Sequence, residues 1–325
     1  MTTTGELARA LMGTIGNDSN YLNCCKWLND AYLLLASKVR LRHLRHVAEL
    51  RTSASYSTGL VTIAQGSTIL TGSMDADGTL PAWESTIGDL NAEYWAIRLG
   101  NVWYSVASID SETQLTLTTA YADATLTNAG YTAVQRYHAG AADSQWFGDF
   151  TLPRLLLCLG KPISHDELNR LAPGRVYTAS YPQVVAEVGA DSHGYPLLEL
   201  YPASASPELV TYIYWSIPAD ISNPSTVLPL KVAPLALKEL ALVYVYRNLK
   251  AEAYRAGKVE EGNSWRNDEM AQSTKNVSII NDAIRQNRGV DDLSIILNFS
   301  GIRAGGDIAT ARDLVYTNWT YPTHV

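Results

Sequence analysis

A segment near the C-terminus, Leu228–Gly257, constrains the fold of this chain more than any other. Pro234 suits the first turn of a helix and Gly257 suits its end. Between them apolar side chains surround the helix, and only Lys238 and Glu239 interrupt them. A helix apolar on every side is buried on every side, and this one is too short and too rich in tyrosine to span a membrane. We expect it at the centre of a helical bundle, or between a bundle and a neighbouring subunit.

The charge balance excludes one broad class of function. The formal net charge of -7 argues against sequence-independent coating of nucleic acid, which needs a net basic surface. The three cysteines, Cys24, Cys25 and Cys158, have no C-x-x-C spacing, so they are expected to be reduced and to bind no zinc. Neither a signal peptide nor a membrane-spanning segment is expected.

The N-terminal region carries a second helical pattern. Six apolar residues recur at helical spacing: Leu22, Cys25, Leu28, Tyr32, Leu35 and Val39. They predict an amphipathic helix from Tyr21 to about Val47. Lys38, Arg42 and Arg45 would share one face of it. That face either is solvated and complements the helix C-terminus, or contacts an acidic partner or DNA phosphates.

From Tyr56 onward the apolar period is two, which is typical of strands. Residues 60–64 and 68–71 flank one turn, and residues 95–99 and 102–109 flank another, so two hairpins are expected. Further strands at 114–119 and 130–137 complete a small antiparallel barrel or sandwich, inserted into a helical protein.

The next region mixes short elements. Asp149–Gly160 is a short apolar segment, and Ser164–Leu171 is expected to be a capped helix. Tyr181–Val188, Leu197–Tyr201 and Leu209–Ser216 predict three strands of a meander.

Two segments follow Gly257. A helix is expected at about Glu260–Arg285, and its apolar face is formed by Trp265, Met270, Val277, Ile280 and Ile284. Beyond Gly289 the chain is expected to be an extended arm that docks on a neighbour, with simple disorder as the alternative. The side chains proposed for that docking are Leu293, Ile296, Phe299, Trp319 and Tyr321.

The sequence holds no recognisable catalytic motif. His43 and His46 have a spacing that suits a shared metal, but no third ligand accompanies them. Four carboxylates, Asp110, Glu112, Asp166 and Glu167, could supply a glycosidase-type pair, but they fit turns and caps better. No catalytic residue, cofactor or metal is therefore assigned, and the chain is not expected to be an enzyme.

The order of these parts resembles the head–tail adaptor (connector) proteins of tailed bacteriophages. The segments Leu60–Ser73 and Ile97–Tyr121, followed by GYTAVQRYHA, are similar to the inserted β-domain of that family. FTLPRLLLC, YPQVVAEVG and LLELYPASASPELVTYIYW follow, with a proline-rich lead into a helix. The resemblance covers roughly Tyr21 to Arg285 and does not extend to the terminal arm.

The resemblance implies a function. Such adaptors form a ring, commonly of twelve copies, beneath the portal protein; the ring extends the DNA channel and carries tail nozzle, tube or fibre proteins. Double-stranded DNA passes through without specific recognition. By this resemblance Leu237, Leu240, Tyr244 and Tyr246 would meet the next subunit, and the arm would grip the portal. The protein would be made in the host cytoplasm and lie at the head–tail junction of the virion.

The expected fold class is α+β: a helical bundle core with an inserted antiparallel β-barrel or sandwich, a β-meander and a C-terminal arm. The expected boundaries are 1–55 and 228–288 for the bundle, 56–140 for the inserted β-domain, 141–227 for the short helix and meander, and 289–325 for the arm. Two other functions stay open. One is a tail-fibre, baseplate or carbohydrate-binding module that uses the aromatic segment Trp83–Tyr104; the other is a virion-associated cell-wall hydrolase.

Overall fold

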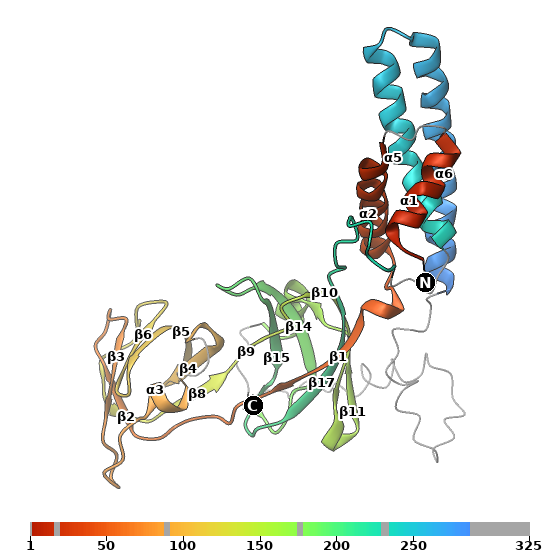
Figure 1. Cartoon of the computed structure of the whole chain (residues 1–325). Coiled ribbons are helices and arrows are strands. Elements are labelled where there is room, and N and C mark those ends of the chain that lie inside the picture. Colours follow the sequence, from red (N-terminus) through yellow and green to blue (C-terminus); the bar gives the residue numbers. More distant parts are fainter. Residues whose placement is uncertain (1, 16–19, 88–91, 174–177, 229–233, 287–325) are drawn as a thin grey trace, which may run out of the picture. The chain divides into compact units, whose positions relative to one another are not determined.

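The computed structural model describes residues 2–15, 20–87, 92–173, 178–228 and 234–286 (Figure 1). The fold is mixed α+β. A β-rich region holds a curled seven-stranded antiparallel half-barrel and other sheets, and two long helices follow it. The coarse fold class expected from the sequence is therefore confirmed.

Helices from both ends of the chain pack together (Figure 1). They are α1 (Thr4–Ile15), α2 (Tyr21–Lys38), α5 (Pro234–Arg255) and α6 (Val259–Gln286). The middle helix is α5, which contacts α1, α2 and α6, whereas α2 touches α6 only marginally. We call α2, α5 and α6 the helical layer.

The ends of α5 lie where its prolines and glycine predict. Pro234 is the first residue of the helix. Gly257 lies two residues after its last residue, Arg255, and has a φ of 73°. The Lys258 N–H donates to the Ala253 carbonyl at 2.9 Å, and the Gly257 N–H donates to the Tyr254 carbonyl at 3.1 Å. These two bonds define a Schellman motif, in which glycine avoids the strain of a left-handed backbone. The tight turn folds α6 back against α5.

The half-barrel forms from the region with period-two apolar residues. Its strand order is β7-β2-β3-β6-β5-β4-β8. The strands are β2 (Leu60–Ile63), β3 (Ile69–Ser73), β4 (Trp95–Leu99), β5 (Val102–Ser111), β6 (Gln114–Leu117), β7 (Leu126–Ala129) and β8 (Tyr131–Gln135). The predicted hairpins β2–β3 and β4–β5 are both present. Trp83 of the short helix α3 (Trp83–Thr86) is fully buried in the half-barrel's core.

Two four-stranded sheets enclose a second core. One has the order β1-β17-β10-β11 and the other β12-β14-β15-β9. Their strands are β1 (Arg45–Arg51), β9 (Tyr137–Ala139), β10 (Ser144–Leu152), β11 (Leu157–Gly160), β12 (Ile163–Ser164), β14 (Val184–Ala190), β15 (Pro196–Tyr201) and β17 (Leu209–Ser216). Phe150 and Tyr212 stack at the centre of this core, with ring centroids 4.8 Å apart.

Short elements complete the described chain. They are the 3-10 turns η2 (Arg42–Leu44), η3 (Ala92–Tyr94) and η4 (Pro153–Leu155), the strands β13 (Thr178–Ala179) and β16 (Ala203–Ser204), and the helix α4 (His165–Leu171). As predicted, the hydroxyl of Ser164 caps α4 by accepting the Glu167 N–H at 3.2 Å.

The predicted helix from Tyr21 to about Val47 is wrong in its last third. The helix ends at Lys38, where Val39 is extended, and residues 45–51 form β1. All seven residues of β1 pair antiparallel with Leu209–Trp215 of β17. The hydrogen bonds of this ladder outweigh the local preference for a helix. Lys38, Arg42 and Arg45 therefore share no helical face.

The predicted meander is also wrong, because its third strand joins another sheet. β14 pairs with β15 as expected, but β17 lies between β1 and β10. The segment Asp149–Gly160 supplies most of the β10–β11 hairpin. On the other side, β9 pairs with β15, so a strand within 56–140 belongs to a sheet formed mainly by 141–227.

Candidate functional site

The helical layer holds the four side chains predicted to meet a neighbouring subunit. Leu237 and Leu240 are buried within the chain itself, at 1% and 0% exposure. Tyr244 and Tyr246 are half-buried. Tyr246 stacks on Trp265 of α6 at 5.9 Å, and burial raises the pKa of Tyr244, with Asp30 of α2 adding to the rise. These residues therefore hold the helices of one chain together, and little of the two leucines is left for a neighbour.

The inner face of α6 is polar at its centre, between Trp265 and the half-buried Ile279 and Ile280. Gln272 and Asn276 are buried, and their amide groups donate to the carbonyls of Glu239 at 2.9 Å and Leu240 at 3.2 Å. Nearer the hairpin turn, Glu269 accepts from Arg247 at 3.0 Å and also pairs with Lys250. Hydrogen bonding from Lys250 is the main reason why the pKa of Glu269 lies below its ordinary value, and Arg247 adds to the effect. Polar contacts thus set the rotation of α6 about its own axis.

That rotation turns apolar side chains to the outside. Met270 is 61% exposed, Val277 is 60% exposed, and Ile284 and Val259 are exposed as well. Met270, Val277 and Ile284 lie seven residues apart, so they follow one side of the helix. We call Val259, Met270, Val277 and Ile284 the α6 stripe. The predicted apolar face is therefore divided: Met270, Val277 and Ile284 are exposed, whereas Trp265 packs on Tyr246 of α5.

An apolar face is also uncovered on α2. Leu22 is 66% exposed and Leu33 39%, and their spacing of eleven residues, about three turns, places them on the same side. Asp30 lies near them and is exposed. We call Leu22, Asp30 and Leu33 the α2 face. The sequence pattern of α2 placed Leu22 on its buried side, so the exposure of this residue was missed.

The predicted basic face is dispersed. Lys38 and Arg42 are exposed, whereas Arg45 is half-buried on β1, opposite Trp215 of β17. The Nε and Nη2 atoms of Arg45 are buried and have no hydrogen-bond partner in the described part of the chain. Nearby, the guanidinium of Arg40 lies 5.0 Å from the ring of Trp146 and 5.2 Å from that of Trp215. The cation of Arg40 therefore packs on aromatic rings of the sheet.

The two histidines considered as a metal pair have separate partners. His43 lies 2.8 Å from the hydroxyl of Tyr32, and burial lowers its pKa. His46 stacks on Tyr214 and lies 3.2 Å from the hydroxyl of Ser216. Neither arrangement brings the two rings to a common ligand position.

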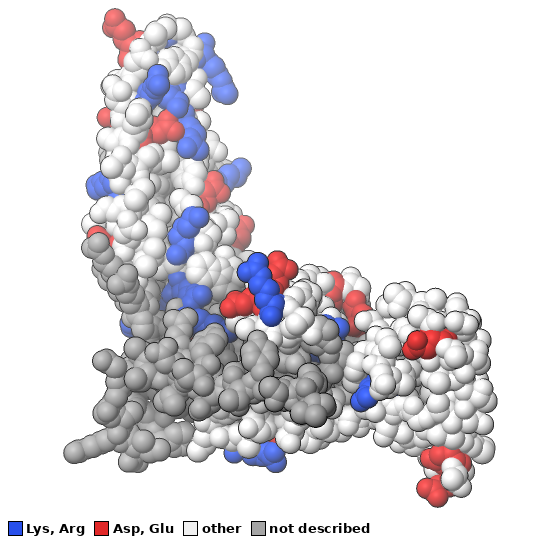
Figure 2. All heavy atoms as spheres, turned by 180° about the vertical axis from the view of Figure 1, so that it is seen from behind, with Lys and Arg blue, Asp and Glu red and all other residues white. Residues whose placement is uncertain are grey.

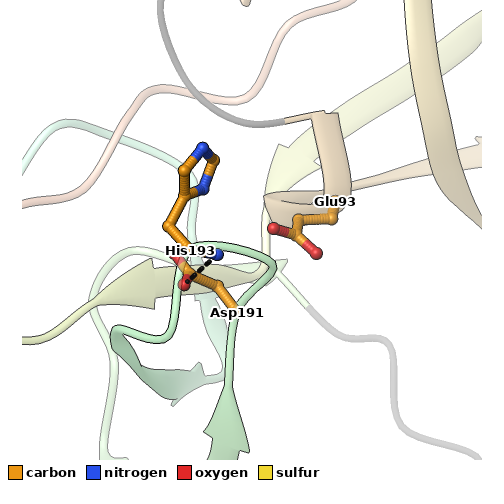
Figure 3. Close-up of side chains that lie close together, drawn as sticks. All are labelled: Glu93, Asp191 and His193. Carbon is orange, nitrogen blue, oxygen red and sulfur yellow. Dashed lines mark hydrogen bonds between the residues drawn. The ribbon is translucent and has the colours of Figure 1, made fainter.

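A different cluster brings together Glu93 of η3 with Asp191 and His193 of the β14–β15 turn (Figure 3). Asp191 is buried and accepts the Tyr94 hydroxyl at 2.5 Å and two turn amides at 2.7 and 2.9 Å. Burial raises the pKa of Asp191, but these bonds outweigh burial and lower it overall. Glu93 accepts both the amide and the hydroxyl of Ser192. Because both carboxylates already accept hydrogen bonds, the cluster is best understood as a clamp that joins the turn to η3.

The carboxylates weighed as a hydrolase pair are engaged locally. Asp110 accepts the hydroxyls of Ser108 and Thr116, each at 2.7 Å, and Glu112 accepts the Ser85 N–H at 3.1 Å. Asp166 and Glu167 lie in the first turn of α4, where acidic residues are favourable.

Charge is unevenly distributed between the regions. Residues 56–135 contain one basic residue, Arg98, and eight acidic residues, which together account for the whole net charge of -7. The acidic residues are Asp75, Asp77, Glu84, Asp89, Glu93, Asp110, Glu112 and Asp123. Figure 2 shows that Lys and Arg alternate with Asp and Glu over the helices, while the half-barrel shows mostly uncharged surface with isolated acidic groups.

Comparison with protein-family models finds no match, and comparison with curated proteins finds none either. Within the described residues, none of the helices combines the length and apolar character needed to cross a bilayer. The residues predicted for portal docking, Leu293, Ile296, Phe299, Trp319 and Tyr321, lie outside the described residues.

Proposed function

We propose that this chain is a structural virion protein, a head–tail adaptor of a tailed bacteriophage. In this function, copies form a ring under the portal that extends the DNA channel and carries the tail. The observation that best supports the proposal is the helical layer: helices from both ends of the chain meet at α5, and the α6 stripe and the α2 face leave apolar surface on it. A ring of identical subunits needs two such different, complementary patches.

The finer architecture is part of the proposal. The helical layer would be the bundle that builds the ring, and the sheets between residues 45 and 216 would be its insertions, facing outward or toward tail proteins. Residues 289–325 would be an arm that grips the portal. A ring of twelve follows from the family resemblance, and the protein would be a homo-oligomer at the head–tail junction.

The charge distribution supports a passive relation to DNA. A channel that lets DNA slide needs few phosphate contacts, because each cation that neutralises a phosphate strengthens binding. The formal net charge of -7 leaves no excess of cations, and over the helices, which would build the ring, Lys and Arg alternate with Asp and Glu (Figure 2). Neither a membrane partner nor a cofactor is part of the proposal.

The direct test is to mix the protein with its cognate portal and examine the particles by negative-stain microscopy. We expect a ring of density added to the portal. A portal that remains bare, together with virions that lack such a ring, would refute the function. Deleting Asp291–Val325 tests the arm: docking is expected to be lost while circular dichroism stays unchanged, and undiminished docking would remove the arm from the proposal.

The carbohydrate-binding alternative has weaker support. Sugar sites need exposed aromatic faces, whereas Trp83 and Trp95 are 0% and 2% exposed in the core of the half-barrel. Trp103 is half-buried against Ala96 and Val134. Loss of glycan binding in a Trp103→Ala variant would favour this alternative. The cell-wall hydrolase would need two converging carboxylates, and substitution of Asp110 and Glu112 is expected to leave any lytic activity unaltered.

A further inference from the structure

The α6 stripe is an unusual surface for a helix that has a polar inner face. Gln272 and Asn276 are buried while Met270 and Val277 are about three-fifths exposed, the reverse of a surface helix. The hydrogen bonds to the Glu239 and Leu240 carbonyls hold this orientation. Regularly spaced apolar side chains on an exposed helix face mark a place where another helix packs.

We propose that the α6 stripe of one copy packs against the α2 face of a second copy. This inference rests on the proposed function, because it assigns residues to the ring contact. Leu237 and Leu240, which the sequence assigned to this contact, are buried within the chain, whereas the residues assigned here are exposed to a neighbour.

The placement of the two surfaces favours a head-to-tail contact. α5 lies between α2 and α6, which touch each other only marginally, so the stripe and the face belong to the two outer helices of the layer. When one outer helix of each copy binds the other outer helix of the next copy, the contact is heterologous and repeats from copy to copy. Such a contact closes into a ring when the rotation allows it.

Charge complementarity selects α2, rather than a second α6, as the partner. Arg266 is exposed one turn before Met270, and Asp30 is exposed one turn before Leu33. Neither enters an ion pair within the described residues. On the side of α6 that carries Met270, Val277 and Ile284, the other exposed residues are uncharged, including Asn267, Thr274 and Asn281, and the exposed acid Glu260 lies at the far end beside Val259. A contact between two such faces would place no acid beside Met270, whereas α2 supplies Asp30. The exposed Lys26 lies one turn before Asp30, so it would have to lie beyond Arg266 in the contact.

The lengths of the two surfaces allow a contact of about three turns. The α2 face from Leu22 to Leu33 spans about 17 Å of helix at 1.5 Å per residue, and Met270 to Ile284 spans about 21 Å. One α2 face can therefore cover most of this part of the stripe, and Val259, eleven residues before Met270, lies beyond it.

Cysteine cross-linking of the full-length chain tests the contact. Cys158→Ser removes the exposed native thiol, since Cys24 and Cys25 are buried. Met270→Cys is placed in one chain and Leu22→Cys or Leu33→Cys in another, and a short bis-maleimide is added with and without the portal. A cross-linked dimer is expected from the mixture but from neither chain alone, and a chain carrying both cysteines is expected to give a ladder. Ala271→Cys, an exposed neighbour rotated away from the stripe, is the matched control and is expected to give no product.

Two outcomes would overturn the inference. A dimer from Met270→Cys alone would mean that α6 pairs with α6, and no intermolecular product under either condition would mean that no second copy covers the stripe. A charge exchange adds a test of the partner helix. Arg266→Asp and Asp30→Arg are each expected to reduce the mixed product at least about fivefold, and the combination is expected to restore it. A combination that stays as weak as the single variants would reject α2 as the partner.

The portal experiment separates this inference from the proposed function. Cross-linking without portal binding would support self-association and refute the adaptor function. Portal binding without cross-linking would preserve the function and reject this contact.

Discussion

The two C-terminal helices lie side by side, but the side chains that each buries most fully are of opposite kinds. α5 is in contact with three other helices and buries apolar residues such as Leu240 and Val245. α6 packs mainly on α5, buries Gln272 and Asn276, and exposes Met270 and Val277. The difference shows that an apolar pattern predicts burial well where neighbours surround a helix, and poorly where one neighbour offers polar partners.

The largest effect is expected from placing a charge in the buried side of α5. Leu240 is 0% exposed, so Leu240→Asp would bury an unpaired carboxylate and should destabilise the fold by at least about 4 kcal/mol. Leu235→Asp on the same helix is the control, because Leu235 is 64% exposed and the change should cost at most about 0.5 kcal/mol. Urea denaturation followed by circular dichroism measures both; equal stability of the two variants would show that α5 is not buried as described.

A smaller effect is expected at the polar inner face of α6. Asn276→Ala removes the bond to the Leu240 carbonyl and the 3.1 Å bond accepted from Gln272, and should cost about 2 kcal/mol in unfolding free energy. Replacing Gln272 and Asn276 together by leucine removes both polar groups at once and should stay within about 1 kcal/mol of the parent. A double variant less stable than Asn276→Ala would show that the polar pairing itself stabilises the hairpin.

The turn that joins the two helices should contribute about 1 kcal/mol. Gly257 has a φ of 73°, and a Cβ built there meets no other atom within 4 Å. Gly257→Ala therefore adds backbone strain without a steric clash, and the expected loss of about 1 kcal/mol is purely conformational. Thermal unfolding should show it. Gly66→Ala, at a similar φ of 78° in the half-barrel, is the matched control and should cost a similar amount.

The smallest effect concerns the ion pairs between α5 and α6 and depends on pH. The pKa of Glu269 is lower in the folded chain than in the unfolded chain. Its contribution to the free energy of unfolding is therefore complete when the pH is above the pKa of the unfolded chain. The contribution is lost as the pH falls through the pKa of the folded chain. At pH 7, Glu269→Gln should cost about 1 kcal/mol or less. The gap between parent and variant, measured by urea denaturation, should close as the pH falls below about 4. A gap that persists in acid would assign the effect to packing.

Much of the fold is predictable because it depends on local signals. The limits of α5, the capped helix after Ser164 and the hairpins of the half-barrel follow from proline, glycine, cap residues and apolar period. Such signals act over a few residues, so no distant partner can change them easily.

The predictions are wrong where the structure of a segment depends on a strand that is distant in the sequence. The predicted N-terminal helix extends to about Val47, but residues 45–51 pair with β17, more than 150 residues away. β17 itself follows the β14–β15 hairpin and yet joins β1 and β10. Each strand can pair with several others, and the pairing observed depends on all strands of the chain. A local sequence pattern therefore does not predict which two strands pair.

In the candidate site, too, some features follow from the local sequence and others depend on tertiary contacts. The sequence by itself determined that two long helices close the described chain, that the first is apolar on most sides, and that residues 56–135 carry the net negative charge. Only the tertiary structure decided which face of α6 is uncovered. Its rotation depends on the carbonyls of Glu239 and Leu240 and the cations Arg247 and Lys250, all on the partner helix. A buried polar group is stable only when its partners are in reach, and those partners become neighbours only after the chain has folded.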